Sequence, residues 1–201
     1  MKSLLPCART AQRRRLLCAG AAALALASLP LRVAAQAVAS PAATNIPPEV
    51  AAEIAGARLQ GSKLFRYFGF RVYDIGLWVG ERAVDDNWAD RPLALAISYQ
   101  RKLGGEQIAE RSLQEMQGLA DVSAADGQRW LQVMKRLFPD VNSGDRLTGV
   151  LLPGKGARFF LNGSLLGEVA EPEFARLFFG IWLAPGSSEP AMRDALLGQA
   201  R

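Results

Sequence analysis

The 201-residue sequence contains no histidine and only two cysteines, Cys7 and Cys18. Both cysteines lie in residues 1–37, a segment with the features of a removable export signal. The rest of the chain then has neither imidazole nor thiolate, which excludes disulfides, cysteine nucleophiles and zinc or haem sites built on these groups. It also excludes catalysis by Ser-His-Asp or Cys-His groups. We therefore expect no metal site and no cofactor.

The first 37 residues have the three parts of an export signal. A basic region ends in Arg13-Arg14-Arg15, an apolar run extends from Leu16 to Leu31, and Ala35-Gln36-Ala37 has the small-x-small pattern of a cleavage site. Ser28 and Pro30 interrupt the run, which falls short of the roughly 20 apolar residues that span a bilayer, so a signal is favoured over an anchor. We predict cleavage after this site, by the Sec or the twin-arginine route. The product would be periplasmic or secreted, with no integral membrane segment.

Positive charge is concentrated in the same segment. The chain has 24 Lys and Arg against 19 Asp and Glu, and six of the cations but none of the acidic residues lie in residues 1–37. The remainder carries 18 cations against 19 acidic residues. A near-neutral domain has no electrostatic case for binding phosphate backbones, so we expect no nucleic-acid partner.

The rest of the chain is long enough for one domain. Residues 38–48 are rich in Pro and Ala without an apolar period, which is typical of a flexible leader. The domain is predicted to cover residues 49–201.

Alternating side chains and β-branched residues predict several strands. Ala57–Val79 reads as two strands, or as one long bent strand kinked near Gly69. Further strands are predicted at Leu93–Tyr99, Arg146–Leu152, Ala157–Leu161 and Leu165–Val169. Asn162-Gly163 predicts a tight hairpin between the last two, because both positions accept a positive φ.

A period near 3.6 predicts four helices. Two follow Tyr99 in succession, and Ser123 is placed to cap the second. Glu171-Pro172 and Glu189-Pro190 open the other two, and Gly198 is a plausible C-cap of the last. This order of strands, two helices, strands and two helices predicts an α+β fold with an antiparallel sheet covered by helices on one face.

Several polar and aromatic residues are candidates for a ligand-binding site. An arginine within an apolar stretch needs an anion or acceptors if it is buried, so one of four arginines is a candidate for binding a ligand carboxylate: Arg66, Arg71, Arg101 and Arg111. Six aromatic residues could line a pocket, although a core position is favoured for any single ring: Phe65, Tyr67, Phe68, Phe70, Tyr73 and Trp78.

Two sets of acidic residues are not predicted to form a binding site. Asp85, Asp86 and Asp90 lack the spacing of a calcium loop and are predicted to form a solvated turn. A second set is predicted to be the exposed side of the helix after Tyr99: Glu106, Glu110 and Glu115.

Several motifs resemble the chalcone isomerase-like proteins. Residues 59–62 (LQGS) and 72–78 (VYDIGLW) resemble their opening sheet, and further segments are similar to the bacterial secreted branch: Phe138–Val141, Gly144–Arg146, Phe159–Gly163 and Phe174–Leu183. The resemblance spans about Glu49 to Gly198. It implies an open-faced β-sandwich, in which a large antiparallel sheet is backed by helices with a cleft between them.

The resemblance also implies where catalytic groups of the plant enzyme would fall. Its helix pattern, Leu-Thr-Gly-x-x-Tyr-x-x-Lys-x-x-x-Asn, falls on this chain at Leu103, Gly104, Gly105, Ile108, Arg111 and Glu115. Its catalytic arginine falls near Phe65, with Lys63 and Arg66 as neighbours, its catalytic threonine on Tyr73, and a substrate-positioning threonine near Leu177. Ile108 cannot hold a water and Phe65 cannot neutralise an oxyanion, so we expect no chalcone isomerisation.

Other, non-enzymatic members of the superfamily resemble fatty-acid binding proteins. In those proteins an arginine and a tyrosine hold the carboxylate of the fatty acid. The leading hypothesis is therefore a non-catalytic exported protein that binds a small amphipathic ligand such as a fatty acid. The candidate ligand-binding residues are Arg66, Tyr73, Tyr99 and Arg111. One alternative is an isomerase of the intramolecular-lyase type that uses Tyr73, Tyr99 or Arg111 on a non-chalcone substrate. The other is a pocketless interaction module, in which Phe65 and Tyr73 fill the cleft.

Overall fold

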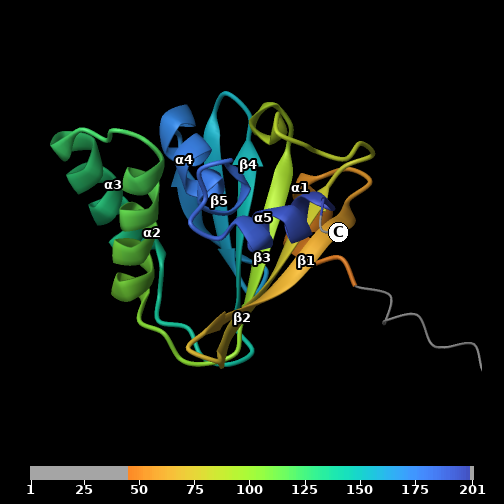
Figure 1. Ribbon diagram of the computed structural model, residues 1–201, viewed down its shortest axis with the longest axis horizontal. Helices are drawn as coiled ribbons and strands as arrows, with labels where there is room; N and C mark the ends of the chain where they lie inside the picture. Colours follow the sequence, from red (N-terminus) through yellow and green to blue (C-terminus); the bar gives the residue numbers. More distant parts are fainter. Residues whose placement is uncertain (1–44, 200–201) are drawn as a thin grey trace, which may run out of the picture. The chain divides into compact units, whose positions relative to one another are not determined.

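The computed structural model describes residues 45–199 (Figure 1). The predicted signal, its cleavage site and most of the predicted leader lie outside the described residues. The elements are α1 (Pro48–Glu53), β1 (Arg58–Tyr67), β2 (Phe70–Val79), η1 (Trp88–Asp90), β3 (Leu93–Tyr99), α2 (Gly105–Leu119), α3 (Ala124–Leu137), β4 (Arg146–Leu152), β5 (Gly156–Leu161), β6 (Ser164–Val169), α4 (Pro172–Leu183) and α5 (Pro190–Leu197).

The six strands form one antiparallel sheet in chain order, β1-β2-β3-β4-β5-β6. This order confirms the predicted α+β fold. It also shows that Ala57–Val79 contains two strands, β1 and β2, and not one long bent strand. The turn between β1 and β2 is Phe68-Gly69, and the predicted turn at Asn162-Gly163 joins β5 to β6. Both turns have two residues with positive φ, which matches the right-handed twist of paired strands.

Helices cover one face of the sheet, as predicted. Alternate strand residues such as Leu77, Leu95 and Phe159 point to this face and form the main core with the apolar sides of α2, α3, α4 and α5. Figure 1 shows α2 and α3 beside each other, next to the sheet. Ser123 caps α3 by accepting a hydrogen bond from the Asp126 backbone N–H, and Gly198 ends α5 in the left-handed region, as the sequence indicated.

A short helix, α1, covers part of the opposite face and was missed from the sequence. Val50 and Ile54 pack there against Trp78 and Val150 in a second, smaller core. The helix begins at Pro48, because a proline at the first helical position needs no hydrogen-bond partner for its nitrogen. One turn of helix offers too short an apolar period to stand out in a Pro- and Ala-rich segment.

Glu49 anchors α1 to the sheet. Its carboxylate is fully buried and accepts hydrogen bonds from Arg146 (2.9 and 3.1 Å) and from the Thr148 hydroxyl (2.7 Å). Burial alone would raise the pKa of Glu49, but the bonds from Arg146 and Thr148 outweigh it and hold the pKa below its usual value. The charged form is therefore the one that the fold stabilises.

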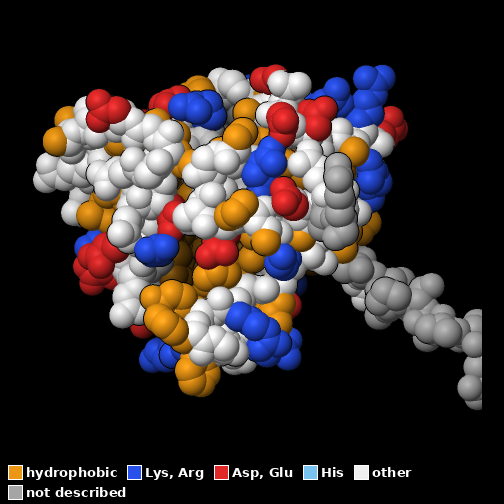
Figure 2. Space-filling view, in the orientation of Figure 1, with side chains coloured by type: hydrophobic (Ala, Val, Ile, Leu, Met, Phe, Trp, Pro, Cys, Tyr) orange, Lys and Arg blue, Asp and Glu red, His pale blue; other side chains and the backbone are white. Residues whose placement is uncertain are grey.

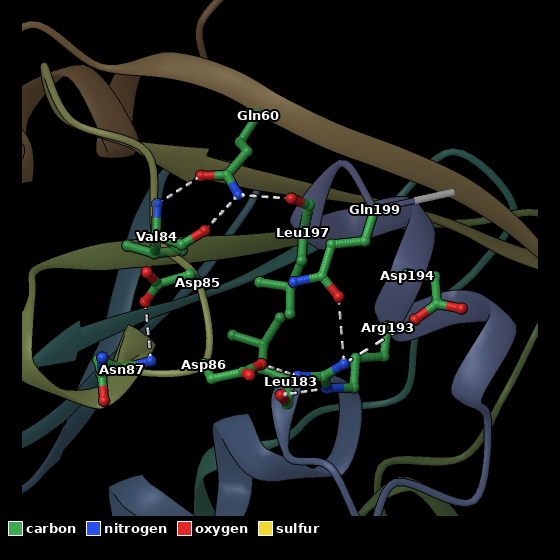
Figure 3. Close-up of polar contacts among 10 residues, drawn as sticks. All are labelled: Gln60, Val84, Asp85, Asp86, Asn87, Leu183, Arg193, Asp194, Leu197 and Gln199. Carbon is green, nitrogen blue, oxygen red and sulfur yellow. Dashed lines mark hydrogen bonds and ion pairs between the residues drawn. The ribbon is translucent and has the colours of Figure 1, made fainter. Parts of the chain in front are cut away.

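Hydrogen bonds of two side chains connect the loop after β2 and helix α5 (Figure 3): the Gln60 amide joins both to β1, and the Arg193 guanidinium joins α5 to the loop and to the end of α4. Gln60 lies at a bulge in β1, where its amide donates to the carbonyls of Val84 (2.7 Å) and Leu197 (3.2 Å). Arg193 of α5 donates to the Leu183 carbonyl (3.0 Å) and pairs with Asp86. α5 packs closely on this strand because Gly61 has no side chain: a Cβ there would lie 2.2 Å from a carbonyl oxygen of α5.

We predict that Glu49→Gln lowers the free energy of unfolding by about 1–3 kcal/mol, because Arg146 loses its charged acceptor in a buried setting. The contribution of Glu49 is complete above the ordinary glutamate pKa of 4.5 and is lost as the pH falls below it, since the native carboxylate has the lower pKa. Urea unfolding at neutral and acidic pH measures both effects. Glu81→Gln, at an exposed position, is the matched control and should leave the pH profile unchanged.

Candidate functional site

A cavity of about 500 Å³ lies on the helix-covered side of the sheet, between the β1–β4 strands, α2, α4 and the start of α5. Its volume is within the range of small-molecule sites. Apolar side chains form most of its wall, and the polar lining groups come from three strands, α2 and two loops. The lining residues are Phe65, Tyr67, Val72, Tyr73, Ile97, Tyr99, Arg101, Leu103, Gln107, Ile108, Arg111, Ser112, Glu115, Leu147, Phe178, Ile181, Trp182, Ser188 and Glu189.

Strand pairing brings three aromatic rings of the lining together. Phe65, Tyr73 and Tyr99 occupy paired positions on β1, β2 and β3, so all three point to the same face. Phe65 stacks on Tyr73 with ring centroids 4.9 Å apart, and Tyr73 meets Tyr99 edge-on at 6.2 Å. These residues line the cavity without filling it, contrary to what the pocketless alternative requires.

The two buried phenols of the cavity, those of Tyr73 and Tyr99, are neutral hydrogen-bond donors. The Tyr73 hydroxyl accepts a hydrogen bond from the Trp182 indole N–H (3.1 Å), which leaves its own proton free to donate. Burial raises the pKa of Tyr73 to about 12 despite that bond, and the carboxylates of Glu189 and Glu115 add to the rise. Burial also raises the pKa of Tyr99, so its hydroxyl keeps its proton as well. A ligand oxygen could therefore accept from both hydroxyls.

One face of α2 forms the opposite wall. Ile108, Arg111, Ser112 and Glu115 recur at i, i+3, i+4 and i+7, a spacing that places them on one side of a helix. Of the positions onto which the resemblance laid the plant helix pattern, Leu103, Ile108, Arg111 and Glu115 line the cavity, whereas Gly104 and Gly105 do not. The interpretation of Glu115 as part of the exposed side was wrong: its carboxylate is 16% exposed and faces the rim. Its i+7 spacing from Ile108 was the signal in the sequence.

Charged groups gather at the rim and largely compensate one another. Arg111 pairs with Glu115, which also accepts a hydrogen bond from Ser188 (2.8 Å), so the rim joins α2 to the segment before α5. Glu189 adds a second carboxylate. Arg101 is exposed, lines the cavity and forms no ion pair within residues 45–199. It is therefore the rim cation with charge available for an anionic ligand. The sequence singled it out as one of four arginines that could bind a carboxylate, but the final set of candidate ligand-binding residues left it out.

The structure places the four candidates in two locations. Tyr73, Tyr99 and Arg111 line the cavity, whereas Arg66 lies outside the lining and donates to the Gly69 carbonyl (3.3 Å) in the hairpin turn. Leu177 is 2% exposed and packs in the core, so nothing at that position reaches the cavity. Lys63 also lies outside the lining and donates to the Ala191 carbonyl.

The other groups singled out from the sequence have structural roles. Asp86 pairs with Arg193, Asp85 accepts from a backbone N–H of its own loop, and Glu106 and Glu110 pair with Lys135 of α3. Within residues 45–199, no acidic side chains gather in a group that could hold a metal ion. None of the helices in that range is long and apolar enough to cross a bilayer.

Comparisons with known proteins agree with this architecture. Residues 40–198 match the model of a family described as chalcone isomerase-like. An uncharacterized protein of Haemophilus influenzae is 33% identical over 141 residues, which are 70% of this chain and 68% of that protein. The crystal structure of a fatty-acid binding protein from Arabidopsis thaliana has a TM-score of 0.57 at 15% identity, over 71% of this chain and 87% of that chain. At that identity, the structural likeness concerns the fold alone.

Proposed function

Because the chain belongs to the chalcone isomerase-like family and keeps an open cavity, we propose that it is an exported, non-catalytic protein that binds a small amphipathic molecule such as a fatty acid. The observation that carries the proposal is the cavity itself. It combines about 500 Å³ of largely apolar space with two neutral phenols and a charged rim. An apolar tail gains from leaving water, while a polar head needs hydrogen-bond partners at one end.

The arrangement of polar groups orients the ligand. Tyr99 is 4% exposed and lies deep in the cavity, whereas Arg101 and Arg111 are exposed at its rim. A carboxylate buried without a counter-charge is costly, so the head group belongs at the rim, near Tyr73 and Arg101. The tail then lies along apolar lining residues such as Ile97 and Leu147. The fatty-acid ligand named for the Arabidopsis thaliana protein supports this class of ligand without identifying it.

A catalytic role has less support from the same residues. Where the resemblance implies a tyrosine that orders water, Ile108 presents a hydrocarbon side chain to the cavity. Where it implies an arginine, Phe65 stacks on Tyr73. Stabilising an enolate requires donors or positive charge aimed at the developing oxyanion, and these two positions supply neither. Binding is therefore favoured over an intramolecular-lyase reaction.

We predict that Ile108→Trp weakens the binding of dodecanoic acid by about tenfold or more, equivalent to about 1.4 kcal/mol, because the indole occupies space that the tail needs. Isothermal titration calorimetry on delipidated protein measures the change. Gln132→Trp introduces the same ring on the exposed side of α3 and should bind like the unmodified protein. Unmodified protein that binds neither this acid nor longer ones would contradict the proposal.

We predict that Arg101→Gln weakens dodecanoic acid binding by roughly five- to tenfold and leaves the binding of its methyl ester within about twofold. The guanidinium attracts the negative charge of the dodecanoate carboxylate, and the methyl ester has no such charge. Lys102→Gln removes the neighbouring exposed cation, which does not line the cavity, and serves as the matched control. An equal loss for acid and ester would show that the head group does not lie at Arg101.

We predict that the protein recovered from its natural host begins at Val38, because the first 37 residues have the charge and apolar pattern of a cleaved signal. Intact mass spectrometry of the extracytoplasmic fraction tests this. Ala37→Glu should block cleavage, since the cleavage site requires small residues, whereas Ala42→Glu should not. A soluble extracytoplasmic protein that retains Met1 would contradict the prediction.

A further inference from the structure

The hairpin between β1 and β2 exposes three aromatic side chains at its end. Tyr67 is 62% exposed, Phe68 84% and Phe70 68%, and we call these three residues the aromatic tip. Among the described residues, only Ile46 and Leu165 are other large hydrophobic side chains with comparable exposure. Figure 2 shows hydrophobic side chains beside Lys and Arg at this end of the molecule. Clustered exposure of this kind marks an interaction surface more often than scattered single residues do.

Folding does not account for the residue at the centre of the tip. Phe68 has φ 47° and Gly69 φ 81°, so the hairpin turn requires the left-handed region at both positions. The equivalent turn between β5 and β6 fills the first position with Asn162, at φ 50°, the residue type that tolerates this conformation best after glycine. Phe68 therefore occupies an unfavourable backbone conformation and gains almost no burial in return.

Positive charge surrounds the aromatic tip. Residues 64–73 and 100–105 contain four cations and no acidic residue: Arg66, Arg71, Arg101 and Lys102. The two segments are joined by the hydrogen bond from the Gln100 backbone N–H to the Val72 carbonyl (2.8 Å). All four side chains are exposed, and the carboxylate that reaches this group is Asp74, 3.8 Å from Arg71. The domain as a whole is near neutral, so this surface is a local concentration of charge.

The aromatic tip is continuous with the cavity. Tyr67 belongs to the tip and also lines the cavity. Its ring lies edge-on to that of Phe68, with centroids 4.6 Å apart. Arg101 likewise belongs both to the cationic surround and to the rim. A surface bound by the tip would therefore lie next to the opening of the cavity.

We propose that the aromatic tip docks this protein onto an anionic lipid bilayer. The aromatic rings enter the interfacial region, where amphipathic and aromatic side chains partition favourably, and the four cations contact the lipid phosphates. A second copy of the chain is a less favourable partner for the aromatic tip. Two tips in contact would bring their cations together, and these would repel each other. The proposal concerns the outer surface and does not require the cavity to hold a fatty acid.

Vesicle co-sedimentation of the delipidated protein tests the proposal. The protein should sediment with vesicles of phosphatidylcholine and phosphatidylglycerol and less with phosphatidylcholine alone, and its binding to the anionic vesicles should fall as the salt concentration rises. Phe68→Asn should weaken binding to the anionic vesicles by about fivefold or more while its melting temperature stays the same or rises, because asparagine suits the turn better. That opposite response separates docking from a loss of folding. Since Phe68 does not line the cavity, dodecanoic acid binding should be unchanged in this variant.

Two matched controls complete the experiment. Leu165→Asn removes an exposed apolar side chain from β6, at the other edge of the sheet, and should not alter sedimentation. The double variant Arg66→Glu/Lys102→Glu should abolish the preference for anionic vesicles, whereas Arg82→Glu, beyond the far end of β2, should retain it. Failure of the unmodified protein to bind anionic vesicles would overturn the proposal. A dimer in sedimentation velocity that dissociates in Phe68→Asn, without vesicle binding, would overturn it in favour of self-association.

Discussion

The packing of Phe178 sets the distance between the helix layer and the sheet. Its ring contacts Phe159 on β5, Phe138 after α3 and its own helix neighbours, with centroids 5.0 to 6.0 Å apart, and it also lines the cavity. On one side of this residue, aromatic rings fill the space between α4 and the sheet. On the other side, β1, β2 and β3 carry Phe65, Tyr73 and Tyr99, whose rings pack on one another and line the cavity. The cavity exists because the layers are held apart by a packed core at one end.

The same division explains the chemistry of the cavity wall. Shielding from water at Tyr73 and Tyr99 favours the neutral phenol, so these groups donate hydrogen bonds and carry no charge. Charges are confined to the rim, where water can reach them and where Arg111 and Glu115 already satisfy each other. Glu49 shows the contrasting case on the opposite face of the sheet: a fully buried carboxylate remains charged only because Arg146 and Thr148 surround it.

The sequence predicted the elements that have a clear period and missed what depends on distant contacts. Helices and strands of ten or so residues repeat their pattern often enough to be recognised, and Asn162-Gly163 specifies its own turn. α1 is held by partners of Glu49 that lie 97 and 99 residues away, and no local pattern contains that information. In the site, Arg66 was named from the sequence beside Tyr73 as a ligand-binding candidate, but the register places Phe65 opposite Tyr73. Neighbouring strand residues point to opposite faces, so Arg66 was excluded once the turn position was known.

Residues that depart from local rules are concentrated at one end of the sheet. Phe68 sits where the turn favours asparagine or glycine, and the three aromatic rings of the tip are mostly exposed. Four exposed cations lie in the same segments, and within the described residues only Arg71 pairs with a carboxylate, that of Asp74. Elsewhere the same chain follows the rules closely, with Ser123 as a helix cap, Gly198 as a C-cap and Asn162 in the matching turn. The turn at Asn162 has a residue that suits its conformation, whereas the equivalent turn has Phe68, which does not. We infer that the residue at position 68 is constrained by something other than folding. Because Tyr67 both lines the cavity and is exposed at the aromatic tip, the proposed ligand site and this surface lie side by side.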